Sequence, residues 1–149
     1  SGIDPAESTK GFHSAFFLPD FDDSKWNSGR DSTAPAGGFG YAKTFAGVDI
    51  GKPENEAHRH TAYFRHSFST DRKYTALELR CRRDDGIICY LDGREVVRDN
   101  MLPGPDGYRL HAAIAMGPEN DSVVHRFPIP GTLAPGPHIL DISPSGEAA

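Results

Sequence analysis

The sequence predicts an all-β fold, an antiparallel β-sandwich or jelly roll. Apolar and polar residues alternate with a period of two in several short segments, the pattern of strands that bury one face. The 16 glycines and 12 prolines of the 149-residue chain favour many turns between short strands. No segment keeps the period of an amphipathic helix for more than about ten residues. Together these three observations favour packed β-sheets over a helical architecture.

Eight short segments are predicted to be strands. The clearest alternation lies in residues 74–82, where Leu77, Leu79 and Cys81 share one face. Residues 61–68 and 87–91 alternate in the same way, and the other segments are short apolar runs between turn signals. The full set of predicted strands is residues 12–18, 61–68, 74–82, 87–91, 95–98, 108–116, 122–129 and 138–142.

The stretch RRDDGIICYLDGREVVRDN, residues 82–100, is the most informative part of the chain. Asp84-Asp85-Gly86 separates two predicted strands, so we expect an antiparallel hairpin with these residues at its tip. Gly86 would supply the positive φ that such a tip requires. Asp92-Gly93 is a second signal, typical of a two-residue hairpin turn, and EVVR would be the returning strand.

The two cysteines, Cys81 and Cys89, flank the expected tip. With a five-residue loop they would lie directly opposite each other, with Cβ atoms about 4.5–5.5 Å apart. A disulfide prefers about 3.8 Å, so a bridge there would be strained. The favoured interpretation is a pair of buried thiols that act as small hydrophobic side chains.

Composition restricts the partners of the chain. Its net charge of −5 predicts no nucleic-acid partner. No apolar run reaches the roughly 18 residues of a membrane-spanning helix, so no membrane insertion is expected. We expect residues 1–11 to be a disordered leader or tag remnant, residues 12–143 to form the β-sandwich domain, and residues 144–149 to be a tail.

Five stretches, in order, resemble the galactose-binding-like β-sandwich domains. They are FDDSKW, GGFGYA, AYFRHSF, RRDDGIICYLDGREVVRDNM and LAPGPHILDI. The chain departs from the family pattern at Ala42, where glycine is usual, and at Asp92 and His138, where asparagine is usual. Arg65 and Arg98 match arginines of the family and are expected to form ion pairs with acidic residues on the sheet.

Such domains are jelly-roll modules appended to bacterial glycosidases, phosphoesterases and cell-surface proteins. The resemblance implies a non-catalytic accessory module of a larger extracytoplasmic protein, whose partners are carbohydrate and the other domains of that protein. Two alternatives stay open. The chain could be a structural spacer or protein-interaction domain without a small ligand, or a fragment of a hydrolase whose active site lies in another domain.

The Asp84-Asp85-Gly86 segment also resembles the hairpin of protective-antigen-type lectin domains, in which two aspartates hold a calcium ion that binds sugar hydroxyls. Three roles for Asp84 and Asp85 remain open. The favoured one is turn chemistry. The others are a calcium site, for which Asp121 would be a further oxygen ligand, and direct hydrogen bonds to a ligand hydroxyl.

The predicted site therefore consists of a small set of residues, with calcium as the candidate cofactor. Tyr41 and Tyr108 are included because aromatic rings stack on sugar rings. No catalytic residue is expected, because adjacent strand residues such as Asp84 and Asp85 point to opposite faces and make a poor acid–base pair. The candidate ligand-binding residues are Asp84, Asp85, Tyr41, Arg98 and Tyr108, and the candidate metal ligands are Asp84, Asp85 and Asp121.

Overall fold

The structure, a computed structural model, contains two compact units. The smaller unit comprises residues 1–3 and 22–59, and the larger comprises residues 4–21 and 60–149. In the smaller unit, β1 (Phe39–Gly40) and β2 (Val48–Asp49) form a short parallel pair. The residues that the structure describes are 5–30, 38–40, 48–50, 61–103, 110–117 and 123–145.

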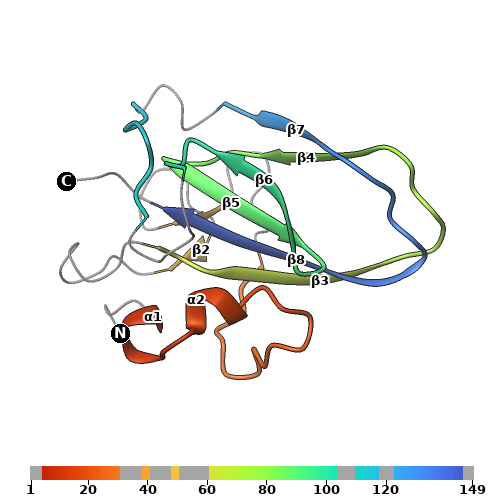
Figure 1. The fold of residues 1–149 in the computed structure, drawn as a ribbon, viewed down its shortest axis with the longest axis horizontal. Helices are drawn as coiled ribbons and strands as arrows, with labels where there is room; N and C mark the ends of the chain where they lie inside the picture. Colours follow the sequence, from red (N-terminus) through yellow and green to blue (C-terminus); the bar gives the residue numbers. More distant parts are fainter. Residues whose placement is uncertain are drawn as a thin grey trace. The chain divides into compact units, whose positions relative to one another are not determined.

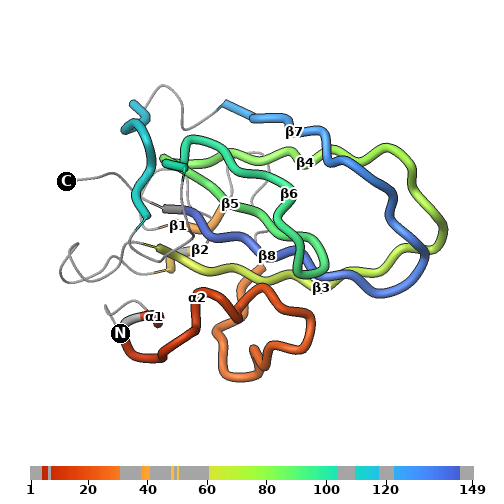
Figure 2. Tube along the Cα trace, in the orientation of Figure 1, coloured from red at the N-terminus to blue at the C-terminus, as the bar shows by residue number. Residues whose placement is uncertain are grey.

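The larger unit is built from antiparallel strands in two sheets, which confirms the all-β prediction (Figures 1 and 2). One sheet has four strands in the order β3-β8-β5-β6, and the other pairs β4 with β7. The strands are β3 (Phe64–Thr70), β4 (Leu77–Cys81), β5 (Gly86–Leu91), β6 (Arg94–Asp99), β7 (His125–Ile129) and β8 (Gly136–Ser145).

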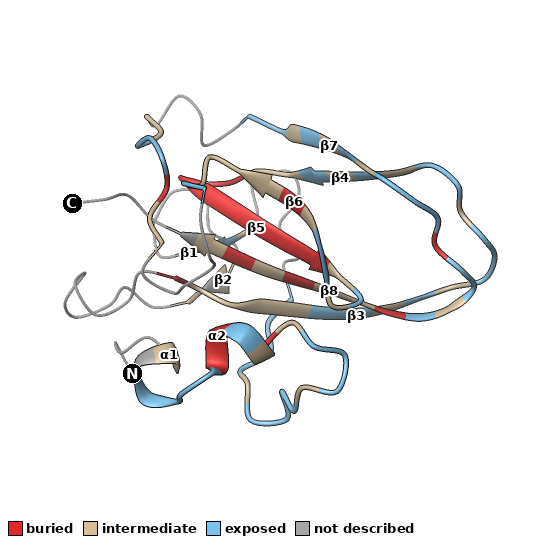
Figure 3. Cartoon of the chain, in the orientation of Figure 1, coloured by how far each residue is buried: buried red, intermediate tan, exposed pale blue. Residues whose placement is uncertain are grey.

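The core lies between the two sheets of this unit. Its centre is Ile87, Cys89 and Val97, which belong to the four-stranded sheet. β5 pairs with both β6 and β8 and is buried along most of its length, as Figure 3 shows. Partly buried side chains from both sheets complete the cluster, namely Leu79, Cys81, Val96, Phe127, Ile129 and Ile142.

The opposite face of the four-stranded sheet is covered by the segment that follows the N-terminus. Phe16 is fully buried and contacts Tyr90 edge-on, and the Phe17 ring stacks on Tyr90 at 4.1 Å. β5 is therefore buried on both faces, which explains why its sequence is almost continuously apolar rather than alternating.

The prediction of a strand over residues 12–18 is wrong. These residues begin with a single helical turn, α2 (Phe12–Ala15), and the backbone then turns toward Pro19. Phe12 and Phe16 are four residues apart, so a helical turn places both rings on the face that meets Tyr63. A short apolar run does not by itself distinguish a strand from a buried helical turn.

The ends of the larger unit carry ordered structure inside segments that we expected to be a leader and a tail. Residues Pro5–Ser8 form the one-turn helix α1, and β8 continues to Ser145. No helix in the described part of the chain is long and apolar enough to cross a membrane.

The predicted hairpin around Asp84-Asp85-Gly86 is wrong. β4 pairs with β7, in the register Cys81 with His125, whereas β5 pairs with β6 and β8. Leu79 and Cys81 lie on the inner face of β4, as expected. They pack against Ile87 and Cys89 of β5, which belongs to the other sheet. The DDG segment therefore connects the two sheets.

The turn at Asp92-Gly93 is confirmed. Leu91 pairs with Arg94 across it, and both turn residues have positive φ, 51° at Asp92 and 79° at Gly93. These angles are those of a type I′ turn, the turn whose twist matches that of the flanking strands. One irregularity follows between Cys89 and Tyr90, where the register shifts and Val96 is left without a partner of its own in the ladder.

The strand predicted for residues 108–116 is also absent over its described part, residues 110–116. Only Ala112 makes a β-bridge there, with Met101. The alternation in LHAAIAM is interrupted by small residues, and the backbone instead follows contacts with Asp85 and Asn100.

Candidate functional site

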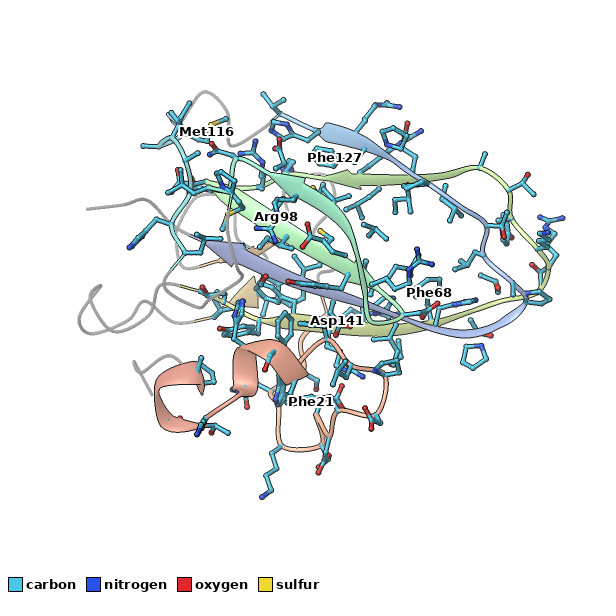
Figure 4. The ribbon with its side chains drawn as sticks, in the orientation of Figure 1. Phe21, Phe68, Arg98, Met116, Phe127 and Asp141 are labelled. Atoms are coloured by element: carbon cyan, nitrogen blue, oxygen red, sulfur yellow. The ribbon has the colours of Figure 1, made fainter. Side chains whose placement is uncertain are left out.

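Asp85 fixes the connection between the two sheets. Its side chain is buried, and its Oδ1 accepts a hydrogen bond of 2.7 Å from the Met116 backbone amide. Its backbone carbonyl accepts from the Asn100 side-chain amide at 3.2 Å and from Arg83 Nη1. Asp85 therefore holds the residue 110–117 segment against the end of β6, and Figure 4 labels Met116 on that segment.

Asn100 also binds the segment of residues 110–117. Its side chain forms two hydrogen bonds with the backbone of Ile114, donating to the carbonyl at 2.7 Å and accepting from the amide at 3.2 Å. The Asn100 carbonyl also accepts from Ala113 N at 2.9 Å. Asn100 has φ 52°, a conformation that asparagine adopts more readily than most residues. The Asn100 side-chain amide thus forms the pair of hydrogen bonds with Ile114 that the backbone of a neighbouring β-strand would form.

Arg83 also stabilises the connection between the two sheets. Its side chain is buried, and its guanidinium pairs with Asp99, with 2.6 Å between Nε and Oδ2. Because another nitrogen of the same group donates to the Asp85 carbonyl, Arg83 ties the end of β6 to the DDG segment. We call residues 82–86, 100–103 and 110–117 the loop platform, since these interactions hold the three segments together at one end of the sandwich.

Position 86 of the loop platform requires glycine for a reason other than the positive φ expected from the sequence. It has no positive φ. Instead, a Cβ atom at this position would clash with Met101 Sδ and would lie 2.7 Å from the Asn100 carbonyl oxygen. The site requires glycine because other chain segments approach its backbone closely.

Asp84 is the exposed member of the aspartate pair. Its neighbour Asp85 is buried and accepts a hydrogen bond from the Met116 amide. The sequence favoured a role for Asp85 in its own turn. Its side chain instead binds the Met116 amide of a loop distant in the sequence. A direct ligand contact by Asp84 stays a prediction.

The other members of the predicted site are only partly described. Tyr41, Tyr108 and Asp121 lie outside the described residues. Among the described residues, no group of three or more His, Cys, Asp or Glu side chains is arranged to hold a metal ion. The calcium site that would need Asp121 stays a prediction.

Arg98 forms the ion pair that its sequence position suggested. Its guanidinium binds both carboxylate oxygens of Glu95, with distances of 2.8 Å and 2.7 Å. Arg98, labelled in Figure 4, pairs with Ile88 in the β5–β6 ladder and so belongs to the sheet, whereas Asp84 and Asp85 belong to the loop platform. A two-point contact of this kind fixes the side chain more firmly than a single hydrogen bond.

Arg65 also forms its expected ion pair, and it has a second role that the sequence did not reveal. Arg65 and Asp141 are 2.9 Å apart, and their side chains are 3% and 0% exposed. The guanidinium also donates to the backbone carbonyls of Phe16, Leu18 and Pro19. Arg65 thereby fastens the N-terminal segment to the sheet around the buried Asp141, which Figure 4 labels.

Both cysteines are free thiols, as the favoured interpretation held. The two cysteines are not opposite each other in a hairpin. Cys81 pairs with His125 in one sheet, and Cys89 pairs with Val97 and Ile142 in the other. Burial raises the pKa of the Cys81 thiol, and burial together with the nearby Cys81 raises the pKa of Cys89 to about 12. A thiol with such a pKa is almost entirely protonated at neutral pH and is a weak nucleophile.

The polar side chains of the loop platform are engaged in hydrogen bonds and an ion pair that hold chain segments together. Asp85, Arg83, Asp99 and Asn100 use their polar atoms to position backbone segments. Their importance was hidden in the sequence because their partners, such as Met116 and Ile114, are backbone groups far along the chain. Comparisons of this chain with protein-family models, with curated proteins and with solved structures give no match.

Proposed function

We propose that this chain is a non-catalytic, carbohydrate-binding accessory module of a larger extracytoplasmic protein, with a jelly-roll fold of the galactose-binding-like type. The observation that carries the proposal is the loop platform, in which Asp85 and Asn100 hydrogen-bond to neighbouring chain segments while Asp84, next to Asp85, is exposed. Loops on a rigid sandwich are the usual place for a binding site.

A fixed loop surface suits a ligand made of hydroxyl groups. A sugar is bound by a few well-placed hydrogen-bonding groups, and a carboxylate such as Asp84 accepts from two neighbouring hydroxyls. Because Asp85, Asn100 and Arg83 already order the loops, little conformational entropy is lost when a ligand binds. The resemblance of the DDG segment to sugar-binding modules supports the same assignment.

The environment of the aspartate pair supports a non-catalytic module. Glycoside hydrolysis uses two carboxyl groups on either side of the bond that breaks, about 5–9.5 Å apart. Asp85 is buried and accepts a hydrogen bond from Met116 N, so it is not available to flank a substrate beside Asp84.

A protein-interaction role is the second candidate, and one observation favours it. Ile114 is 69% exposed and Leu102 is 46% exposed, although the Asn100 amide fixes the backbone of Ile114. Aliphatic side chains held outward on an ordered backbone are typical of contacts with another protein surface.

Affinity electrophoresis in gels that contain soluble polysaccharides tests the carbohydrate proposal. We expect at least one polysaccharide to retard the wild-type protein, and we expect Asp84→Ala to weaken that binding by about tenfold, since a hydrogen bond to a charged group contributes about 1.5 kcal/mol or more. Asp71→Ala is the matched control, because Asp71 is an exposed aspartate between β3 and β4. Equal retardation of Asp84→Ala and wild type would remove the loop platform from the binding site. An absence of retardation across the panel would favour the protein-interaction role.

Calcium is expected to leave the stability of the protein unchanged. Asp85 Oδ1 already accepts the Met116 amide, and a bound ion would have to compete for that carboxylate. The measurement compares melting temperatures in millimolar calcium and in chelator. A site occupied at a hundredfold excess over its dissociation constant would add about 2.7 kcal/mol to the free energy of unfolding. A rise in melting temperature that Asp84→Ala abolishes would instead place an ion at the DDG segment.

A further inference from the structure

His138 connects the Asp92-Gly93 turn to the beginning of β8. Its Nδ1 lies 2.7 Å from Asp92 Oδ2, and its Nε2 lies 2.8 Å from the Ala134 carbonyl oxygen. The ring is buried and lies 5.5 Å from the Phe68 ring of β3. Both ring nitrogens therefore face hydrogen-bond acceptors.

Only the charged form of the ring satisfies both acceptors. A neutral imidazole carries one N–H and can donate to Asp92 or to Ala134, whereas the imidazolium donates to both. The Asp92 carboxylate further stabilises the charged ring, because it is the ion-pair partner of the ring. Among the described groups that hydrogen-bond to the ring or lie against it as a second ring, Asp92 is the charged one.

The turn and the strand are joined by two further hydrogen bonds. Asp92 Oδ1 accepts from Ile139 N at 2.9 Å, and Asp92 N donates to the Ile139 carbonyl at 2.9 Å. One carboxylate thus binds the ring and the backbone amide of consecutive residues of β8. A change in the charge of His138 acts directly on the group that holds the β5–β6 turn in place.

We infer that Asp92 and His138 form a pH-sensitive latch, which holds the β5–β6 turn against β8 while the imidazole is charged and loosens when it loses its proton. The hydrogen bonds that the ring donates to Asp92 and to the Ala134 carbonyl raise the pKa of His138 above its usual 6.5. Since the folded protein holds this proton more tightly than the unfolded chain, the stabilisation is complete below pH 6.5 and is lost as the pH rises through the folded pKa.

Asp92→Asn is the informative variant. Asn-Gly is itself a favoured pair for a type I′ turn, so the turn is kept, and the amide oxygen can still accept from Ile139 N. The substitution removes the negative charge that stabilises the imidazolium. His138→Asn is the complementary variant, since it leaves a hydrogen-bonding side chain that does not titrate.

The test is an NMR titration of the His138 ring and the Ile139 amide between pH 5 and about pH 9, a range that spans the ordinary histidine pKa. In the wild type we expect a ring midpoint above 6.5, with the Ile139 amide shift following the same midpoint and its exchange protection falling above it. In Asp92→Asn the ring midpoint should fall, and the stability difference from wild type should shrink as the pH rises. A wild-type midpoint at or below 6.5, or identical profiles in the two proteins, would overturn the latch.

Discussion

Replacing Arg65 with alanine is expected to destabilise the larger unit by about 3–5 kcal/mol, the usual loss when one partner of a buried ion pair is removed. Asp141 is 0% exposed, so the substitution would leave its carboxylate in the interior without the guanidinium. The carbonyls of Phe16, Leu18 and Pro19 would lose the donor that fastens the N-terminal segment. Chemical denaturation of the purified variant measures the loss.

Two further variants separate charge from geometry at this position. Arg65→Lys keeps the positive charge but not the planar group that donates in several directions, so we expect an intermediate loss. Arg72→Ala removes an exposed arginine from the same unit and should change the free energy of unfolding by less than about 0.5 kcal/mol. Equal stability of Arg65→Ala and Arg72→Ala would contradict the role of the buried pair.

Replacing Gly86 with alanine is expected to cost about 1–3 kcal/mol, the usual loss on overpacking a filled interior. The added methyl group would approach the Asn100 carbonyl oxygen to 2.7 Å, and that oxygen belongs to the backbone and cannot rotate away. The strain would fall on the loop platform, so the ligand binding that we propose for Asp84 should weaken along with stability. Denaturation and affinity electrophoresis measure the two effects.

Gly38→Ala is the control for this prediction. A Cβ atom there meets no other described atom within 4 Å, and the residue has no positive φ. We therefore expect no loss of stability from that substitution. If Gly86→Ala were as stable as Gly38→Ala, the close packing of Met101 and Asn100 around Gly86 would be disproved.

The local elements of the sheets could be predicted from the sequence, because local physics determines them. Leu77, Leu79 and Cys81 alternate with polar residues and take the inner face of β4. Asp92-Gly93 forms its turn because Gly favours positive φ and Asp tolerates it. In both cases the deciding interaction lies within a few residues along the chain.

The pairing of strands could not be predicted in the same way. The alternation in β4 identifies which of its faces is buried, but this pattern is satisfied equally well with β4 beside β5 in one sheet or opposite β5 in another. The turn residues Asp84-Asp85-Gly86 favoured a hairpin. The structure instead uses Asp85 to bind Met116 N, a contact 31 residues away along the chain.

The candidate site was predicted in part for the same reason. Asp84, Asp85 and Arg98 stand out in the sequence as charged residues in a motif, and the structure divides them between the loop platform and the sheet. Asn100 did not stand out, since it acts through the backbone of Ile114 and Asp85, which has no sequence signature. His138 stood out only as a departure from the family pattern, and its pairing with Asp92, 46 residues away along the chain, was not predicted. A polar residue with backbone partners is recognised only when the fold is known.

Cross-strand backbone NOEs reveal whether the DDG segment joins two sheets and so creates the loop platform. This topology predicts contacts of Cys81 with His125, and contacts of Cys89 with Val97 on one side and Ile142 on the other. Contacts between the backbones of Cys81 and Cys89 would contradict it, because they would place Asp84 and Asp85 at the tip of a hairpin.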